Sequence, residues 1–162
     1  MILLQELIST DSPINSKLRI HISSKPIDKL YSRDVMQGNE PVTKPNGLWY
    51  GFGREWLDLL MHDLERDISK HYIYFVKITN SSKILRIHNK EGMISFVEKY
   101  YWKPLIDWRR VANDYSGIEI NPWQGKLYRE MSNMSWYGTW DVASGCVWDT
   151  SCIELKLIYP KK

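Results

Sequence analysis

Three side chains that could act on one substrate lie far apart in this sequence: a histidine, a tyrosine between glycines, and a glutamate. They are His21 in Arg19-Ile-His-Ile-Ser23, Tyr50 in Gly47-Leu-Trp-Tyr-Gly51, and Glu119 in Gly117-Ile-Glu-Ile120. A histidine can bond a ligand near neutral pH, an aromatic ring can stack on a flat ligand, and a carboxylate in a cleft can serve acid or base chemistry. Each role requires the backbone to turn the side chain into a pocket.

The stretch 107–123 positions the glutamate. Its first half has apolar residues at helical spacing, and a Tyr-Ser-Gly sequence ends that pattern. A short strand follows, in which Glu119 stands between Ile118 and Ile120. Because side chains alternate along a strand, Glu119 points to the opposite face of the sheet from both isoleucines.

Residues 17–22 alternate polar and apolar side chains, as a half-buried strand does. His21 falls on the same side as Lys17 and Arg19. A histidine on the polar face of a strand is solvated unless that face forms the floor of a pocket, and in that case it can contact a ligand.

Residues 47–53 place aromatic side chains between glycines. A glycine carries no side chain, so this strand allows another group to approach it closely. The ring of Tyr50 could then stack on a flat ligand. An aromatic strand that packs only on its own sheet is an equally good interpretation of the same pattern.

Other periodic segments surround these motifs: a helix over 54–70, strands over 71–78 and 82–88, a helix over 91–102, and short strands between 136 and 158. Residues 32–46 form a loop, and the second half is mainly β. We expect an α+β fold in a single domain over 1–162, with 1–16 as a peripheral lead-in and 17–158 as the core.

The composition is that of a globular chain. Its 162 residues are 43% hydrophobic and 25% charged, and its net charge is +3. No apolar run is long enough to span a membrane, and the N-terminus lacks the basic leader and cleavage site of a signal peptide. The two cysteines, Cys146 and Cys152, are too few for a disulfide framework. A reducing, cytoplasmic location is therefore expected.

Several chemistries are excluded by what the sequence lacks. The four histidines are far apart, so no metal site is predicted. Ser144 has no glycine at the position that a hydrolase elbow requires, and nucleotide-binding glycine patterns are absent. The eight tryptophans and ten tyrosines, against three phenylalanines, are unusual and favour clefts or stacking surfaces as well as core positions.

The order of the motifs resembles the ADP-ribosyltransferase superfamily. It is closest to the histidine-tyrosine-glutamate branch, which includes diphtheria-toxin-like enzymes and poly(ADP-ribose) polymerase catalytic domains. The resemblance rests on Arg19 to Ser23, Gly47 to Gly51, Lys83 to Ile87, and Asp107 to Glu119, and covers roughly residues 17–150. It implies a split β-sheet core with flanking helices, and NAD as co-substrate.

The resemblance also implies a role for each matching residue. His21 would bond the adenosine ribose of NAD, with Ser23 assisting, and Gly47 would offer a backbone contact to the nicotinamide. Tyr50 would stack on the nicotinamide, although Trp49 competes for that role. Glu119 would be the catalytic carboxylate that bonds the nicotinamide ribose and stabilises positive charge as the N-glycosidic bond breaks.

Two positions depart from the family. Gly117 stands where the arginine-modifying branch carries Glu or Gln, so arginine modification is not expected. Gly51 stands where a serine is usual. The function expected from the resemblance is mono-ADP-ribosylation of a protein or nucleic-acid acceptor, without a membrane partner.

A different function class fits the same composition. The tryptophans and the mild positive charge also suit a non-enzymatic module that binds single-stranded nucleic acid, with Trp136, Trp140 and Trp148 as a stacking platform. A structural role in a larger assembly is a further alternative. Release of nicotinamide from NAD would favour the enzyme, and salt-sensitive oligonucleotide binding without such release would favour the module.

Overall fold

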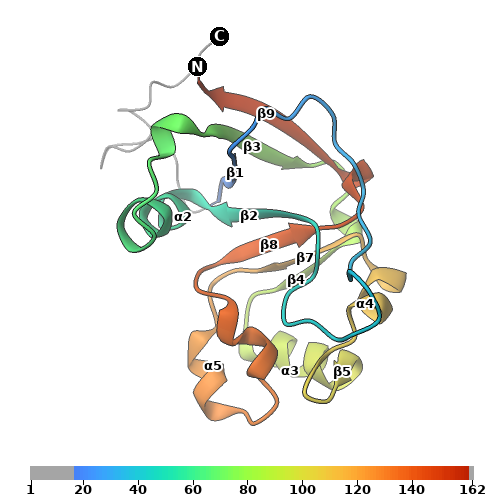
Figure 1. The fold of residues 1–162 in the computed structure, drawn as a ribbon. Coiled ribbons are helices and arrows are strands. Elements are labelled where there is room, and N and C mark those ends of the chain that lie inside the picture. Colours follow the sequence, from blue (N-terminus) through green and yellow to red (C-terminus); the bar gives the residue numbers. More distant parts are fainter. Residues whose placement is uncertain (1–16, 161–162) are drawn as a thin grey trace.

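A computed structural model describes residues 17–160, and the expected lead-in 1–16 lies outside them. The predicted α+β class is confirmed, because a seven-stranded mixed sheet and a two-stranded hairpin are combined with helices (Figure 1). The large sheet consists of β1 (Arg19–Ser23), β2 (Leu48–Phe52), β3 (Tyr72–Ile78), β4 (Ile84–Ile87), β7 (Gly117–Ile120), β8 (Ser144–Val147) and β9 (Ile153–Tyr159). The hairpin consists of β5 (Tyr101–Trp102) and β6 (Leu105–Ile106).

The helical segments are short apart from α3. The α-helices are α2 (Gly53–Asp58), α3 (Lys90–Tyr100), α4 (Trp108–Asp114) and α5 (Gly125–Glu130). The 3-10 turns are η2 (Ile68–Lys70), η3 (Ser81–Lys83), η4 (Ser135–Thr139) and η5 (Thr150–Cys152), and η1 (Leu59–Asp63) is a π-helical turn. Of the four α-helices within residues 17–160, three (α3, α4 and α5) lie between strands of the second half of the chain.

The smallest number of paired residues between neighbouring strands of the sheet is found between β1 and β2. Its strand order is β4-β7-β8-β2-β1-β3-β9, and only β4 and β7 are parallel. β1 and β2 share two register pairs, Arg19 with Phe52 and Ile20 with Gly51, whereas β1 and β3 share four. The pairing of β1 with β2 therefore ends at Ile20, and His21 is the first residue of β1 beyond it.

The sheet curves so that one face becomes concave. Buried side chains from β2, β3, β4, β8 and β9 form one hydrophobic cluster, whose members include Val76 of β3, Ile84 of β4 and Val147 of β8. The side chain of Arg19 on β1 also bonds Glu119 on β7 across the two strands between them, as a curved sheet allows. We call this concave side the inner face.

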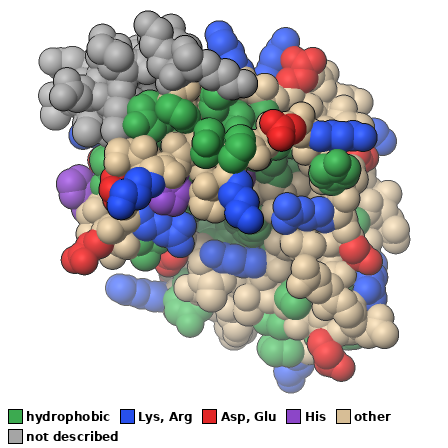
Figure 2. Space-filling model, turned by 45° about the horizontal axis from the view of Figure 1, so that its top comes forward, with side chains coloured by type: hydrophobic (Ala, Val, Ile, Leu, Met, Phe, Trp, Pro, Cys, Tyr) green, Lys and Arg blue, Asp and Glu red, His purple; other side chains and the backbone are tan. Residues whose placement is uncertain are grey.

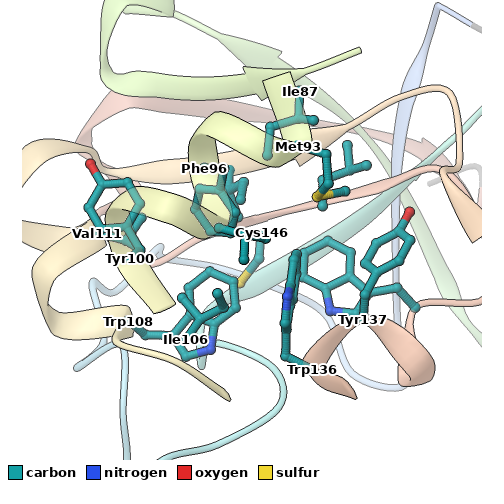
Figure 3. Close-up of a cluster of buried hydrophobic side chains, with 14 of the residues drawn as sticks. Ile87, Met93, Phe96, Tyr100, Ile106, Trp108, Val111, Trp136, Tyr137 and Cys146 are labelled. Atoms are coloured by element: carbon teal, nitrogen blue, oxygen red, sulfur yellow. The ribbon is translucent and has the colours of Figure 1, made fainter. Parts of the chain in front are cut away.

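Helices cover the opposite, outer face. Leu57 of α2 packs on Ile20 and Ile73 of the outer face. A second and larger core lies between α3, α4, η4 and the outer face of β4, β7 and β8. Figure 3 shows part of this core, including Trp108 and Trp136. No helix of residues 17–160 is long and apolar enough to cross a membrane.

Two local predictions differ from the structure. The helix expected over 54–70 ends early, because the side chain of Asp67 accepts a hydrogen bond from the Ser69 amide and starts a separate 3-10 turn. Trp136 and Tyr137 lie in η4 and not in a strand. A helical turn directs Trp136, Tyr137 and Trp140 into one buried cluster, which an alternating strand would split between two faces.

Candidate functional site

The strand registers bring His21, Tyr50 and Glu119 to the inner face. Glu119 of β7 lies opposite Gly145 of β8, and Gly145 lies opposite Tyr50 of β2. Directly paired residues share a face of a sheet. Arg19 shares that face because it pairs with Phe52, two residues after Tyr50, and His21 follows Arg19 by two residues.

Donors from three strands hold the carboxylate of Glu119, which is 5% exposed. Its Oε1 accepts hydrogen bonds from the Arg19 Nε and from the Tyr50 hydroxyl, the latter at 2.7 Å. Its Oε2 accepts a hydrogen bond from the Arg19 Nη2 at 3.2 Å and forms an ion pair with the Arg86 Nε at 3.5 Å. We call these four residues the glutamate clasp.

A small hollow opens beside the clasp. Its volume is about 230 Å³, and its lining includes Arg19, Phe52, Arg86, Glu119 and Asn121. The guanidinium of Arg19 also lies 5.7 Å from the centre of the Phe52 ring. Burial lowers the pKa of Arg19, but the hydrogen bond and the charge of Glu119 outweigh this effect and raise that pKa above its ordinary value. Arg19 is therefore a permanent cation beside the carboxylate.

Tyr50 supports Glu119 with its hydroxyl. Its side chain is completely buried, and a Cβ atom added at Gly145 would lie 2.5 Å from the Tyr50 Cζ. Burial, followed by the charge of Glu119, raises the pKa of the Tyr50 hydroxyl well above its usual value, so the hydroxyl remains a donor. The expected stacking of this ring on nicotinamide has no room in this arrangement, because both ring faces are enclosed by protein.

Trp49 does not share this face with Tyr50. Its ring packs edge-on against Trp140 of the large core, with ring centres 4.9 Å apart, and its Nε1 donates to the Pro45 carbonyl at 3.2 Å. The backbone carbonyl of Trp49 accepts from the His21 ring. Of the two candidates for the stacking role, Trp49 therefore points away from Glu119.

His21 lines a hollow of about 630 Å³. Its Nδ1 lies 2.5 Å from the Trp49 carbonyl, which can only accept, so Nδ1 carries the hydrogen and Nε2 is an acceptor. Burial lowers the pKa of His21, and the charge of Arg33 lowers it further, against the opposing effect of the Trp49 carbonyl. Neutral His21 is thus the favoured form.

Ser23 and Gly47 line the same hollow. The Ser23 hydroxyl donates to the Lys25 carbonyl at 2.6 Å, so its proton is already used in a local turn. A Cβ atom at Gly47 would lie 2.6 Å from the Val147 carbonyl oxygen, which explains the glycine. The structure thus gathers three predicted residues, His21, Ser23 and Gly47, around one hollow and places Tyr50 and Glu119 farther along the same face.

The sequence alone did not identify four basic residues near these hollows. Arg19 and Arg86 hold Glu119, while Arg33 and Arg66 line the hollow at His21. The alternation of polar and apolar residues over 17–22 places Arg19 on the same face as His21, so the sequence contained a signal for Arg19. The pairing of Arg86 with Glu119 depends on the parallel register of β4 and β7, which no local pattern specifies.

The predicted stacking platform of Trp136, Trp140 and Trp148 is wrong for this fold. All three rings are buried, with exposed fractions of 0%, 2% and 4%. They fill the large outer-face core and have no surface left for a nucleic-acid base. Within residues 17–160, no group of three or more His, Cys, Asp or Glu side chains could hold a metal ion.

Replacing Tyr50 by Phe tests the clasp with the least change in shape. We expect the free energy of unfolding to fall by about 2 kcal/mol, because a buried hydrogen bond to a charged group is lost. The matched control is Tyr74→Phe, which removes a hydroxyl that accepts from the neutral Ile27 amide at 2.8 Å. We expect this control to lower the free energy of unfolding, measured by urea denaturation, by about 1 kcal/mol. Equal losses in the two variants would contradict a stronger hydrogen bond from Tyr50 to the charged Glu119.

The lowered pKa of His21 predicts how stability depends on pH. Its folded pKa lies below the unfolded value of about 6.5, so the unfolded chain binds more protons as the pH falls. The stabilising contribution is complete above about pH 6.5 and is lost as the pH falls toward the folded pKa. Urea unfolding at several pH values between about 5 and 8 gives the free energy of unfolding of the wild type and of His21→Gln. This free energy should depend less steeply on pH in the variant, and an identical pH dependence would contradict the prediction.

Comparisons with known proteins add no relative. No protein-family model matches the chain, and neither the curated proteins nor the solved structures include a match.

Proposed function

We propose that this protein is an NAD-dependent mono-ADP-ribosyltransferase that acts from the inner face of its sheet. The observation that carries the proposal is the arrangement of His21, Tyr50 and Glu119 on one concave face, beside the point where the pairing of β1 with β2 ends. The hollow at His21 has the volume of a typical small-molecule site.

The hollow at His21 suits the adenosine and diphosphate part of NAD. Neutral His21 offers Nε2 as an acceptor for a ribose hydroxyl. Arg33 and Arg66 line the same hollow and supply positive charge for the diphosphate. Gly47 brings backbone without a side chain to the wall of the hollow.

The glutamate clasp suits the nicotinamide ribose of NAD, where the bond breaks. As the bond between ribose C1′ and the nicotinamide nitrogen breaks, its electron pair leaves with nicotinamide and positive charge develops on the ribose. The carboxylate of Glu119 stabilises that charge, and it takes the proton of the acceptor group that forms the new bond to C1′. Both carboxylate oxygens are bonded to arginine, so contact with the ribose requires the bond to Arg19 to open.

The spacing of Leu48 and Tyr50 along β2 shows how far the hollow at His21 lies from the glutamate clasp. Leu48 lines the hollow at His21, and Tyr50, two residues farther on, bonds Glu119. Two residues of a strand span about 7 Å, a distance that one extended ligand can bridge. The acceptor of ADP-ribose is a protein or a nucleic acid.

Incubation with NAD labelled in its adenosine part tests this function. We expect nicotinamide release, with label transferred to a protein or nucleic-acid acceptor added as a cell extract. Release without transfer would indicate hydrolysis to ADP-ribose and would contradict a transferase. Absence of release with every acceptor would overturn the proposal as a whole.

A further inference from the structure

A solvent-exposed aromatic surface lies on α5 and the segment before it. Trp123 is 47% exposed and Tyr128 is 52% exposed, whereas Trp108, Trp136, Trp140 and Trp148 are buried. Leu127 is the one buried residue of α5, so Lys126 and Arg129 also face solvent. We call Trp123, Lys126, Tyr128 and Arg129 the α5 surface. It is distinct from the inner face, because α5 lies with the helices at the lower end of the molecule (Figure 1).

Both exposed rings are held in place by backbone. The Trp123 Nε1 donates to the Trp140 carbonyl, and a Cβ atom at Gly125 would lie 2.2 Å from the Trp123 ring. A Cβ atom at Gly138 would similarly lie 2.8 Å from the Tyr128 ring. Each ring therefore rests against a glycine and keeps part of its surface open to solvent. A ring fixed in this way loses little conformational entropy when a ligand stacks on it.

Two basic side chains, Lys126 and Arg129, line the same hollow as the Trp123 ring. Lys126 and Arg129 have no acidic side chain within ion-pair distance among residues 17–160, while the nearby Glu130 is 3.4 Å from the Lys90 Nζ. Trp123, Gly125, Lys126, Arg129 and Glu130 line one hollow of about 340 Å³. Figure 2 shows further Lys and Arg side chains across the middle of the face that it draws.

We propose that the α5 surface binds single-stranded nucleic acid. Fixed aromatic rings next to unpaired cations are what an unpaired strand requires, because its bases stack on the rings and its phosphates meet the cations. An acidic peptide would use the cations but would leave the exposed indole of Trp123 without a matching partner. This binding requires no NAD and goes beyond the proposed function, for which it would supply a nucleic-acid acceptor.

Fluorescence anisotropy with a labelled single-stranded DNA of about 16 nucleotides tests the proposal without NAD. Trp123→Ala should weaken binding by about 5- to 100-fold, as expected for the loss of base stacking. Joint replacement of Lys126 and Arg129 by Gln should reduce the slope of log affinity against log salt by about 1.4, since each phosphate contact contributes about 0.7. Circular dichroism would verify that each variant is folded. If Trp123→Ala does not fold, the variant with Gln at both Lys126 and Arg129 still tests the surface.

A matched control uses the hairpin formed by β5 and β6. Trp102 is also 47% exposed and is followed by the exposed Lys103, but neither residue lines the hollow at Trp123. Trp102→Ala and Lys103→Gln should leave the affinity unchanged. Lack of binding, equal competition by an acidic peptide, or equal losses at both surfaces would overturn the proposal. Glu119→Gln should bind the oligonucleotide normally, so a failure of NAD chemistry is distinguishable from a failure of this surface.

Discussion

Replacing Glu119 by Gln is expected to reduce ADP-ribose transfer by about 100-fold or more and to lower the free energy of unfolding by about 3 kcal/mol. The loss of transfer follows from removing the negative charge that stabilises the ribose cation. The loss of stability follows from the clasp, because the partly buried Arg19 then has no counter-charge. Nicotinamide release and urea unfolding measure the two effects separately.

A double variant separates catalysis from stability. Arg19→Gln combined with Glu119→Gln removes both charges, and we expect it to recover about 1 kcal/mol or more of the stability lost in Glu119→Gln alone. Transfer should remain absent in the double variant. Glu154→Gln is the control for the chemical change, since its ion pair with Lys77 at 3.8 Å is exposed and contributes less than about 1 kcal/mol. Recovery of transfer in the double variant would contradict a catalytic role for the carboxylate.

Replacing Gly145 by Ala is expected to disturb the glutamate clasp by displacing the Tyr50 ring. The new Cβ atom would lie 2.5 Å from the Tyr50 Cζ and 2.6 Å from its hydroxyl oxygen, and the buried ring must shift. We expect a loss of about 1–3 kcal/mol in the free energy of unfolding. Transfer should fall as well, because the Tyr50 hydroxyl that positions the Glu119 Oε1 moves with the ring.

Ser144→Ala is the control for this variant. Ser144 precedes Gly145 on β8 and so faces the outer side of the sheet, and its hydroxyl bonds the Val142 carbonyl at 3.1 Å. We expect a cost of about 1 kcal/mol and normal transfer. If Gly145→Ala and Ser144→Ala had the same effects on stability and on transfer, the packing of Tyr50 over Gly145 would have no functional consequence.

Strand alternation made the position of Glu119 predictable. Ile118 and Ile120 lie in the large outer-face core, and Glu119 between them bonds Tyr50 on the inner face. The same rule put His21 on the side of Arg19. These predictions are accurate because the alternation of side chains is a local property of the backbone.

The contacts of Glu119 were not predictable because they depend on long-range register. Arg19 is 100 residues away from Glu119 in sequence, and Tyr50 is 69 residues away. The sequence assigned the stacking role to Tyr50 with Trp49 as a competitor, and only the position of β2 between β1 and β8 decided which ring faces the carboxylate. Composition likewise could not distinguish the buried Trp136 from the exposed Trp123.

In the proposed function, one bound NAD spans the inner face from His21 to Glu119. A crystal structure of Glu119→Gln with NAD tests it most directly, because the variant should retain uncleaved NAD. We predict a hydrogen bond from an adenosine ribose hydroxyl to the His21 Nε2, the diphosphate beside Arg33, and the nicotinamide ribose next to residue 119. NAD bound anywhere else on the molecule, or saturating NAD with no density in this region, would contradict the claim.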